Sequence, residues 1–255
     1  MEYMEMNQVV NLSGGKDSTA MLLMMLQRGE PIHSVVWFDT GWEFPEMQDH
    51  IDKLEHYVGF EFVRLKPKRS FYDWMFNYTI YKGKQSGRHG VGWPSPLRRW
   101  CTREKTKEIK QFVRKVDNPV QCIGYAADEA QRKLKDKEFN YRFPLQEYNI
   151  TEQQALAYCM KHGFDWSGLY EVFNRVSCFC CPLQRLSELR KLRRHYPELW
   201  SKMLEWDQNM PDNRGFKGYK TVNDLEQRFQ MEDKKLKLPW GGVINSDEEG
   251  FVRAI

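Results

Sequence analysis

One short segment near the start of the sequence limits the folds open to this chain. An apolar run at 9–12 leads into a glycine pair flanked by hydroxyl residues, and a second apolar run follows at 20–26. This order is typical of a buried strand, a tight turn and a helix. Adjacent glycines let the backbone adopt positive φ and approach a ligand closely, and a helix directs free N–H groups and its positive dipole end at the turn. The segment therefore predicts an anion site, and a phosphate chain fits it best.

The turn supplies the polar groups for this site. Its hydroxyls can donate hydrogen bonds, and Lys16 adds a positive charge. The spacing matches neither the Walker loop nor the Rossmann glycine pattern. A plain Gly-Gly helix entry capped by serine is the structural alternative. The predicted anion-binding residues are Ser13, Gly14, Gly15, Lys16, Asp17, Ser18 and Thr19.

Composition sets the class of protein. The chain has 255 residues, 41% hydrophobic and 29% charged, which is ordinary for a globular protein. No stretch has the run of roughly 18 apolar residues that spans a bilayer, so we expect a cytoplasmic protein without membrane association. In that compartment the six cysteines are expected to be reduced, and a cluster of them indicates metal binding or catalysis.

Strand and helix signals alternate through the first half of the chain. Strands are predicted at 9–12, 32–38, 61–65 and 120–124, with helices at 45–57 and 102–116. This alternation predicts an α/β fold with a parallel sheet and helices on both faces. Ser13, Asp39 and Gly124 then fall at strand ends, where ligands bind in such sheets. The pattern becomes mostly helical afterwards, so we expect a nucleotide-binding domain at 1–150 and a helical, cysteine-containing region at 151–255.

Two sets of motifs resemble known families. The Ser-Gly-Gly-Lys-Asp-Ser loop after a short strand resembles the PP-loop of the ATP pyrophosphatase (adenine nucleotide α-hydrolase-like) superfamily, which implies a HUP/PP-loop type of α/β fold. Downstream, the segments 39–46, 99–107 and 123–132 resemble elements of the phosphoadenosine phosphosulfate (PAPS) reductase family. Tyr125 and Ala126 stand where that family carries an arginine. The resemblance implies that the nucleotide contacts Asp39, Thr40, Gly124 and Arg132.

The cysteines predict a metal site. Cys178 and Cys181 have the C-x-x-C spacing that turns two thiolates toward one metal. Cys101 stands where PAPS reductase relatives carry a cluster ligand, and the fourth ligand is Cys180, Cys122 or none. We expect an iron–sulfur cluster of the 4Fe–4S type, with zinc and no metal as alternatives, and an inert core thiol at Cys159. The predicted metal ligands are Cys101, Cys178, Cys180 and Cys181.

Positive charge is unevenly spread although the net charge is only +4. Lysines and arginines concentrate at 66–103 and again at 185–194. Such clusters are typical of nucleic-acid or nucleotide binding. A solvated helix face is the alternative, above all for the second cluster.

The resemblance implies three functions. In the first, the protein uses ATP with Mg²⁺ to adenylate an acceptor, releases pyrophosphate, and a sulfur donor such as a cysteine desulfurase supplies sulfur. The DNA phosphorothioation sulfur-transfer proteins resemble this design, so nucleic acid is a candidate acceptor. Lys16 and Asp17 are the predicted catalytic residues, with Lys16 offsetting charge on the leaving pyrophosphate.

In the second, the protein is a PAPS or adenylylsulfate reductase, and in the third a nucleotide-binding module without catalysis. Sulfonucleotide reductases attack with a cysteine on a C-terminal tail, and this sequence has no cysteine after Cys181. They also tend to lose the complete loop, which is intact here. Both observations favour ATP as the ligand, so the first function is our expectation.

Overall fold

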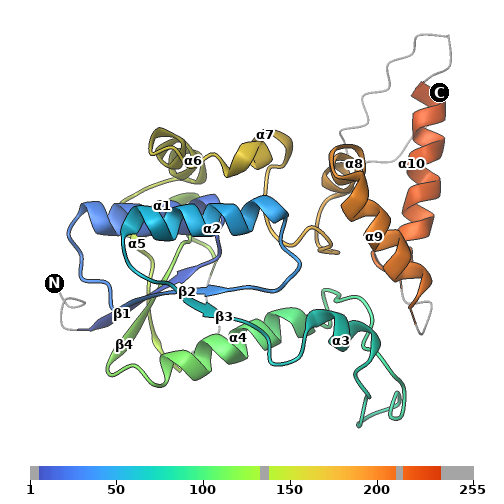
Figure 1. The fold of residues 1–255 in the computed structure, drawn as a ribbon, viewed down its shortest axis with the longest axis horizontal. Coiled ribbons are helices and arrows are strands. Elements are labelled where there is room, and N and C mark those ends of the chain that lie inside the picture. Colours follow the sequence, from blue (N-terminus) through green and yellow to red (C-terminus); the bar gives the residue numbers. More distant parts are fainter. Residues whose placement is uncertain (1–5, 133–137, 211–214, 237–255) are drawn as a thin grey trace. The chain divides into compact units, whose positions relative to one another are not determined.

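The structure, a computed structural model, describes residues 6–132, 138–210 and 215–236. These residues form a parallel five-stranded sheet in the order β3-β2-β1-β4-β5. The chain moves outward from β1 to β3 and then continues with β4 on the other side of β1, so the strand order reverses between β1 and β4 (Figure 1). Ligands of such sheets bind at this switch point, beyond the carboxyl ends of the strands. The strands are β1 (Asn7–Leu12), β2 (Ser34–Phe38), β3 (Val63–Leu65), β4 (Pro119–Ile123) and β5 (Asn140–Arg142).

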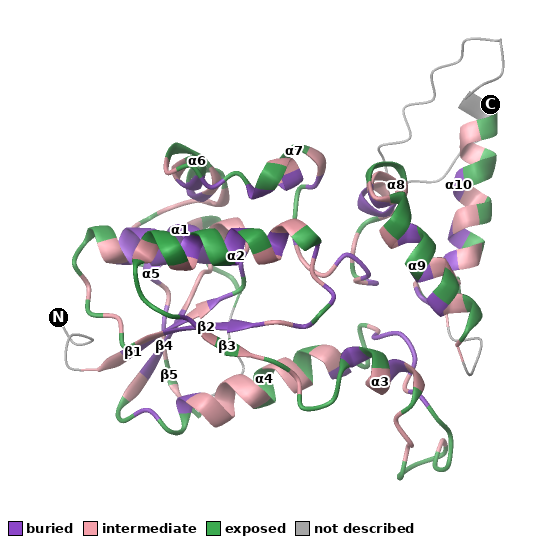
Figure 2. Cartoon of the chain, in the orientation of Figure 1, coloured by how far each residue is buried: buried purple, intermediate pink, exposed green. Residues whose placement is uncertain are grey.

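Helices cover both faces of the sheet, which confirms the predicted fold class. α1 (Lys16–Gln27) and α2 (Pro45–Val58) lie over one face, and α4 (Trp100–Val113) lies against the other (Figure 1). On the α4 side, Val9 and Val36 of the sheet pack with Val113 in one apolar cluster. Buried residues run through β1, β2 and β4 (Figure 2). Because helices cover both faces, buried side chains lie on both sides of the central strands, and they include the polar Gln8 and Gln121.

A further layer of short helices lies over α1 and α2. It contains α6 (Glu152–Lys161), the 3₁₀ turn η3 (Trp166–Gly168) and α7 (Leu169–Val172). α6 packs on α1, and η3 packs on α2 (Figure 1). Thr151 starts α6 with a capping box, accepting from the N–H of Gln154. The remaining short elements between β3 and α6 are α3 (Phe71–Phe76), η2 (Ala127–Glu129) and α5 (Pro144–Glu147).

The chain separates into two compact units. The first contains the described parts of 1–73 and 99–179, and the second those of 74–98 and 180–255. The boundary expected at residue 150 therefore falls inside the first unit, because α6 packs on α1 and η3 on α2. The segment 74–98 joins the second unit through Trp93, whose Nε1 donates to the Asp207 carboxylate over 3.3 Å. No helix of the described residues is both long and apolar enough to cross a membrane.

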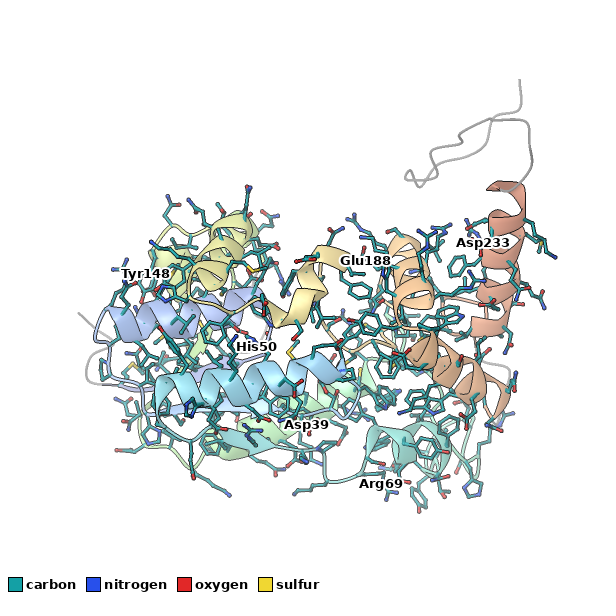
Figure 3. The ribbon with its side chains drawn as sticks, turned by 45° about the horizontal axis from the view of Figure 1, so that its top comes forward. Asp39, His50, Arg69, Tyr148, Glu188 and Asp233 are labelled. Atoms are coloured by element: carbon teal, nitrogen blue, oxygen red, sulfur yellow. The ribbon has the colours of Figure 1, made fainter. Side chains whose placement is uncertain are left out.

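In the second unit, ion pairs join α8 (Leu186–His195) to α10 (Val222–Leu236), while α9 (Pro197–Gln208) packs on both. Arg190 bonds Glu232 at 2.7 Å, and Arg193 bonds Glu226 at 2.8 Å. Arg193 also bonds Asp233 of α10 at 2.7 Å; Asp233 is labelled in Figure 3. Much of the second basic cluster of the sequence therefore holds these two helices together.

Candidate functional site at the carboxyl edge of the sheet

The loop that follows β1 has the geometry its glycines predict. Gly14 has a φ of +81°, and a Cβ at this position would lie 2.5 Å from the Sδ of Met47 on α2. Both the left-handed backbone and the close approach of α2 therefore require glycine. Gly15 is the N-cap of α1, so the first free N–H groups of that helix face the loop. This arrangement provides the backbone donors of an anion site.

The serine hydroxyls close the loop on itself. Ser18 Oγ accepts from the N–H of Ser13 at 3.1 Å and lies 2.9 Å from Ser13 Oγ. Thr19 is placed differently. It is fully buried, and its hydroxyl lies 3.0 Å from Nε2 of His50 on α2. The structure therefore gathers Ser13 and Ser18 at the loop and directs Thr19 into the contact between α1 and α2.

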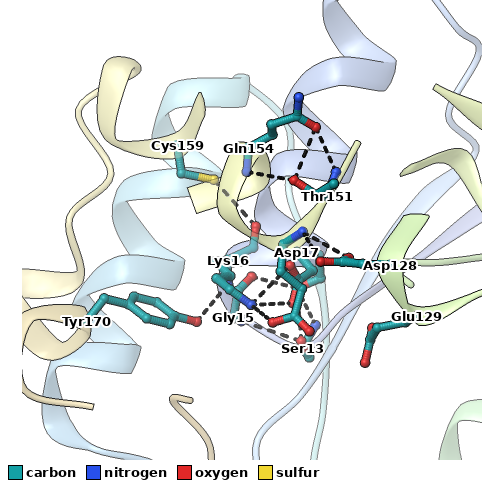
Figure 4. A network of polar contacts seen from close by, with 12 residues as sticks. Ser13, Gly15, Lys16, Asp17, Asp128, Glu129, Thr151, Gln154, Cys159 and Tyr170 are labelled. Carbon is teal, nitrogen blue, oxygen red and sulfur yellow. Dashed lines mark hydrogen bonds and ion pairs between the residues drawn. The ribbon is translucent and has the colours of Figure 1, made fainter. Parts of the chain in front are cut away.

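Lys16 and Asp17, labelled in Figure 4, form an ion cluster with Glu152 of α6. Lys16 Nζ lies 3.1 Å from Asp17 and 2.5 Å from Glu152. Burial tends to lower the pKa of Lys16, but the hydrogen bond to Glu152 and the charge of Asp17 outweigh it, so the pKa is raised. Burial raises the pKa of Asp17, and the neighbouring charges of Glu152 and Glu129 add to it against the effect of Lys16. The cluster keeps the ammonium group protonated beside the loop.

Residues beyond 150 hold the backbone of the loop in place. Trp166 Nε1 donates to the Gly14 carbonyl over 2.7 Å, and the Cys159 thiol donates to the Lys16 carbonyl over 3.4 Å. Tyr170 Oη accepts from the N–H of Lys16 at 2.8 Å (Figure 4). We call Cys159, Trp166 and Tyr170 the loop clamp. Trp166 has a positive φ of 52°, a strained conformation that the surrounding packing must maintain.

His50 supports the clamp from α2. Its ring stacks on Trp166 with centroids 4.4 Å apart, and Figure 3 labels it in the packed layer of the first unit. Burial, together with the charge of Lys53, lowers the pKa of His50 to about 3. The ring is therefore neutral at physiological pH, and Trp166 keeps an uncharged stacking partner.

The Tyr170 hydroxyl gives a direct test of the clamp. Tyr170→Phe removes the acceptor of the Lys16 N–H and keeps the ring, so we expect the free energy of unfolding to fall by about 1 kcal/mol. Urea denaturation followed by circular dichroism measures this loss. Tyr81→Phe removes an exposed hydroxyl and should leave the stability unchanged. Equal stability of the two variants and the parent would show that the Tyr170 bond does not stabilise the loop.

Gly124 follows β4 and lies against the start of α1. A Cβ at this position would lie 2.9 Å from both the Cα and the N of Ser18. Glycine is therefore required for β4 to approach the loop across the switch point. Arg132 lies near the same strand end, where its guanidinium covers the Tyr125 ring at 4.3 Å and pairs with Glu129. The structure thus brings Gly124 into contact with the loop and places Arg132 on Tyr125.

The turn after β2 contains polar side chains that are held by hydrogen bonds and an ion pair. The Asp39 carboxylate accepts from the N–H of Gly41 at 2.8 Å and pairs with Lys66 at 3.4 Å. The Thr40 hydroxyl donates to Glu43 over 2.6 Å and lies 3.5 Å from the Cys178 sulfur. Burial raises the pKa of the Glu43 carboxyl, and the hydrogen bond from Thr40 offsets only part of this effect. Asp39 and Thr40 are therefore ordered by their own turn at the carboxyl edge of the sheet.

The cysteines differ in their exposure and in the compact unit to which they belong. Cys122 and Cys159 are buried, and burial raises the pKa of each thiol to about 12. Cys101 and Cys178 belong to the first unit, and Cys180 and Cys181 to the second. Among the described residues, no three or more histidine, cysteine or acidic side chains are grouped so that they could hold a metal ion. The metal site therefore stays a prediction from the sequence.

Several residues of the site carry no signal in the sequence. Tyr170 and Trp166 lie more than 150 positions from the loop residues they bond. Glu152 could be placed at the start of a helix from Thr151, but its partner Lys16 could not be identified. Cys159 is the buried thiol expected there, and it also bonds the loop. Only the tertiary packing of α6, η3 and α7 on α1 and α2 brings these groups together.

Comparisons with known proteins give the family. Residues 7–184 match the phosphoadenosine phosphosulfate reductase domain. An uncharacterized protein of Methanocaldococcus jannaschii is 25% identical over 205 residues, covering 76% of this chain and 40% of that protein. Sulfate adenylyltransferase subunit 2 of a Marinomonas species is 22% identical over 164 residues, covering 62% of this chain and 48% of that subunit. The chain therefore spans less than half the length of either relative.

The fold is similar to a solved structure. A phosphoadenylyl-sulfate reductase from Candida auris, crystallised as a phosphate complex, superposes with a TM-score of 0.51 and 16% identity. The match covers 68% of this chain and 81% of that one, and it supports the α/β fold. With the family match extending from β1 to beyond α7, the chain belongs to the phosphoadenosine phosphosulfate reductase domain family.

Proposed function

We propose that this protein uses ATP to adenylate an acceptor for sulfur transfer and releases pyrophosphate. Its family and its sulfate adenylyltransferase relative support nucleotide-dependent sulfur chemistry. The observation that carries the choice of ATP is the intact loop between β1 and α1, with Lys16 held beside it. An acceptor oxygen attacks the α-phosphorus, the bond from that phosphorus to the bridging oxygen breaks, and pyrophosphate leaves. A sulfur donor then displaces the adenylate from the acceptor.

The residues of the loop have separate parts in this proposal. Backbone N–H groups in the first turn of α1, other than that of Lys16, which donates to Tyr170, bind the β- and γ-phosphates. The Lys16 ammonium offsets the charge that develops on the leaving pyrophosphate. Asp17 and Glu152 hold that ammonium at the loop. Gly124 lets the strand end lie close to the loop, and Asp39 and Thr40 offer polar groups at the neighbouring strand end for the adenosine.

An iron–sulfur cluster bound by Cys101, Cys178, Cys180 and Cys181 belongs to the proposal as its sulfur-handling group, with zinc as the alternative metal. It rests on the spacing of these cysteines in the sequence. No step above depends on it. Metal and sulfide analysis of protein purified without oxygen tests it: iron with sulfide supports a cluster, and stoichiometric zinc or an absence of metal excludes one.

Pyrophosphate release tests the function. The protein is incubated with ATP and Mg²⁺, with and without DNA or RNA and a sulfide source, and pyrophosphate is measured by a coupled assay. We expect release that rises when the right acceptor is present. Sulfite formed from PAPS, without ATP consumption, would instead identify a sulfonucleotide reductase, which the family match favours as the second candidate. Nucleotide binding without either reaction would identify a non-catalytic module.

A further inference from the structure

The outer face of α4 carries a row of cations. Arg103, Lys107, Lys110 and Arg114 follow one another at intervals of three or four residues, so their side chains lie on one side of the helix. They line an open surface groove of about 390 Å³. We call this set the α4 stripe: Arg103, Thr106, Lys107, Lys110 and Arg114. We propose that the α4 stripe binds the phosphodiester backbone of a nucleic acid.

The charges of the α4 stripe are only partly neutralised. Glu138 bonds Lys110 at 2.8 Å and Arg114 at 2.6 Å, and Glu104 lies 3.5 Å from Arg103. The segment 103–114 itself carries five lysines and arginines against two glutamates. On α8, by contrast, Arg190, Lys191 and Arg193 are matched by carboxylates of Glu188 and α10. Compared with α8, α4 therefore retains a net positive surface.

The shape of the α4 stripe selects the kind of partner. From Arg103 to Arg114 it extends about 16 Å along the helix at 1.5 Å per residue. One strand of a duplex carries a phosphate about every 3.4 Å of axis, so the stripe can follow roughly five phosphates. The Thr106 hydroxyl is a further donor of the kind that contacts phosphates. The stripe contains no apolar side chain, whereas a protein interface has an apolar centre and a membrane-bound helix an apolar face.

The direction of α4 connects the stripe to the site. α4 ends at Val113 and β4 begins at Pro119, so the C-terminal end of α4 lies toward the amino edge of the sheet. Its other end, with Arg103, lies toward the carboxyl edge, where the loop after β1 is found (Figure 1). A strand bound along α4 would extend toward that edge. The inference rests on the proposed function, because it identifies nucleic acid as the class of acceptor in that reaction.

Nucleic-acid binding by the full chain tests the proposal. Fluorescence anisotropy is measured with labelled single-stranded DNA, duplex DNA and RNA of one sequence, over a range of salt concentrations. Arg103→Gln/Lys107→Gln is expected to weaken binding about tenfold or more and to lower the slope of log affinity against log salt by about 2. The control Lys161→Gln/Arg194→Gln removes two exposed cations outside the stripe and should change affinity less than twofold. The three probes show which nucleic acid is preferred.

Three results would overturn the proposal: no binding of any nucleic acid at low salt, equal losses in the α4 and control variants, or binding only of an acidic peptide or anionic vesicle. Lys16→Ala separates this proposal from the function proposed above. That variant should bind nucleic acid as the parent does even if it releases no pyrophosphate. Pyrophosphate release by a protein that binds no nucleic acid would reject the α4 stripe and leave the ATP reaction standing.

Discussion

Lys16→Ala is expected to lower the rate of pyrophosphate release from ATP by about 100-fold or more. The substitution removes the charge that would offset the leaving pyrophosphate, and loss of one such electrostatic group typically costs 10²–10³ in rate. It also leaves Asp17 and Glu152 without the ammonium that lies 3.1 and 2.5 Å from them. The assay is initial pyrophosphate release at saturating ATP, so that a change in binding does not conceal the change in the chemical step.

The controls for Lys16 use the same ion cluster. Glu152→Gln removes one ion partner of Lys16 and leaves the positive charge of Lys16 in place, so we expect a smaller loss of rate than with Lys16→Ala. Lys161→Ala removes an exposed lysine and should leave the rate unchanged. Circular dichroism of Lys16→Ala verifies that the fold is retained. A folded Lys16→Ala protein with parental turnover would exclude the loop lysine from the mechanism.

Arg142→Leu is expected to lower the free energy of unfolding by about 3–5 kcal/mol, because it leaves carboxylates of a buried ion cluster unpaired. Arg142 is 8% exposed and ends β5. Its guanidinium bonds Gln8 at 2.7 Å, Glu147 at 2.7 Å, and Glu30. Tyr148, labelled in Figure 3, also donates to Glu30. Urea denaturation measures the loss.

The same cluster predicts a pH dependence. Burial tends to raise the pKa of Glu30, but the hydrogen bonds from Arg142 and Tyr148 outweigh it and hold the pKa below its usual 4.5. A lowered pKa stabilises the fold above pH 4.5, and that contribution is lost as the pH falls through the folded pKa. The deficit of Arg142→Leu should therefore be largest near neutral pH and shrink below about pH 4.

A matched arginine on the surface controls for the loss of charge. Arg64 pairs with Asp52 at 2.6 Å and with Glu55, and its side chain is 31% exposed. Solvent screens such pairs, so Arg64→Leu should cost about 1 kcal/mol or less. Equal losses for Arg64→Leu and Arg142→Leu would show that burial of the Arg142 cluster adds nothing to stability.

The sequence predicts four of the five strands of the sheet but not β5, the strand at one edge. The apolar runs predict four of the strands because helices cover both faces of the sheet. β5 was not predicted, since Asn140, Tyr141 and Arg142 form no apolar run. Its pairing with β4 and the burial of Arg142 among distant carboxylates create the strand. A strand stabilised by such long-range contacts has no local pattern.

The candidate site shows the same limit. The glycines and Lys16 are recognisable because their chemistry is local to the loop. Thr19 has the right residue type for a phosphate ligand, but the turn of the helix directs it toward His50 instead. The two basic clusters look alike in the sequence. The second cluster is neutralised by carboxylates of α10 that lie more than 30 residues from the arginines they pair with.

The loop clamp determines how short a working fragment of this protein can be. A fragment that ends at residue 150 would keep every glycine and hydroxyl of the loop. It would lose Glu152, Cys159, Trp166 and Tyr170, the groups that hold Lys16 and the loop carbonyls. Such a fragment would contain the phosphate-binding motif but would have to order it at the moment of binding, at a cost in affinity. The smallest fragment with a preorganised loop must therefore extend through α7.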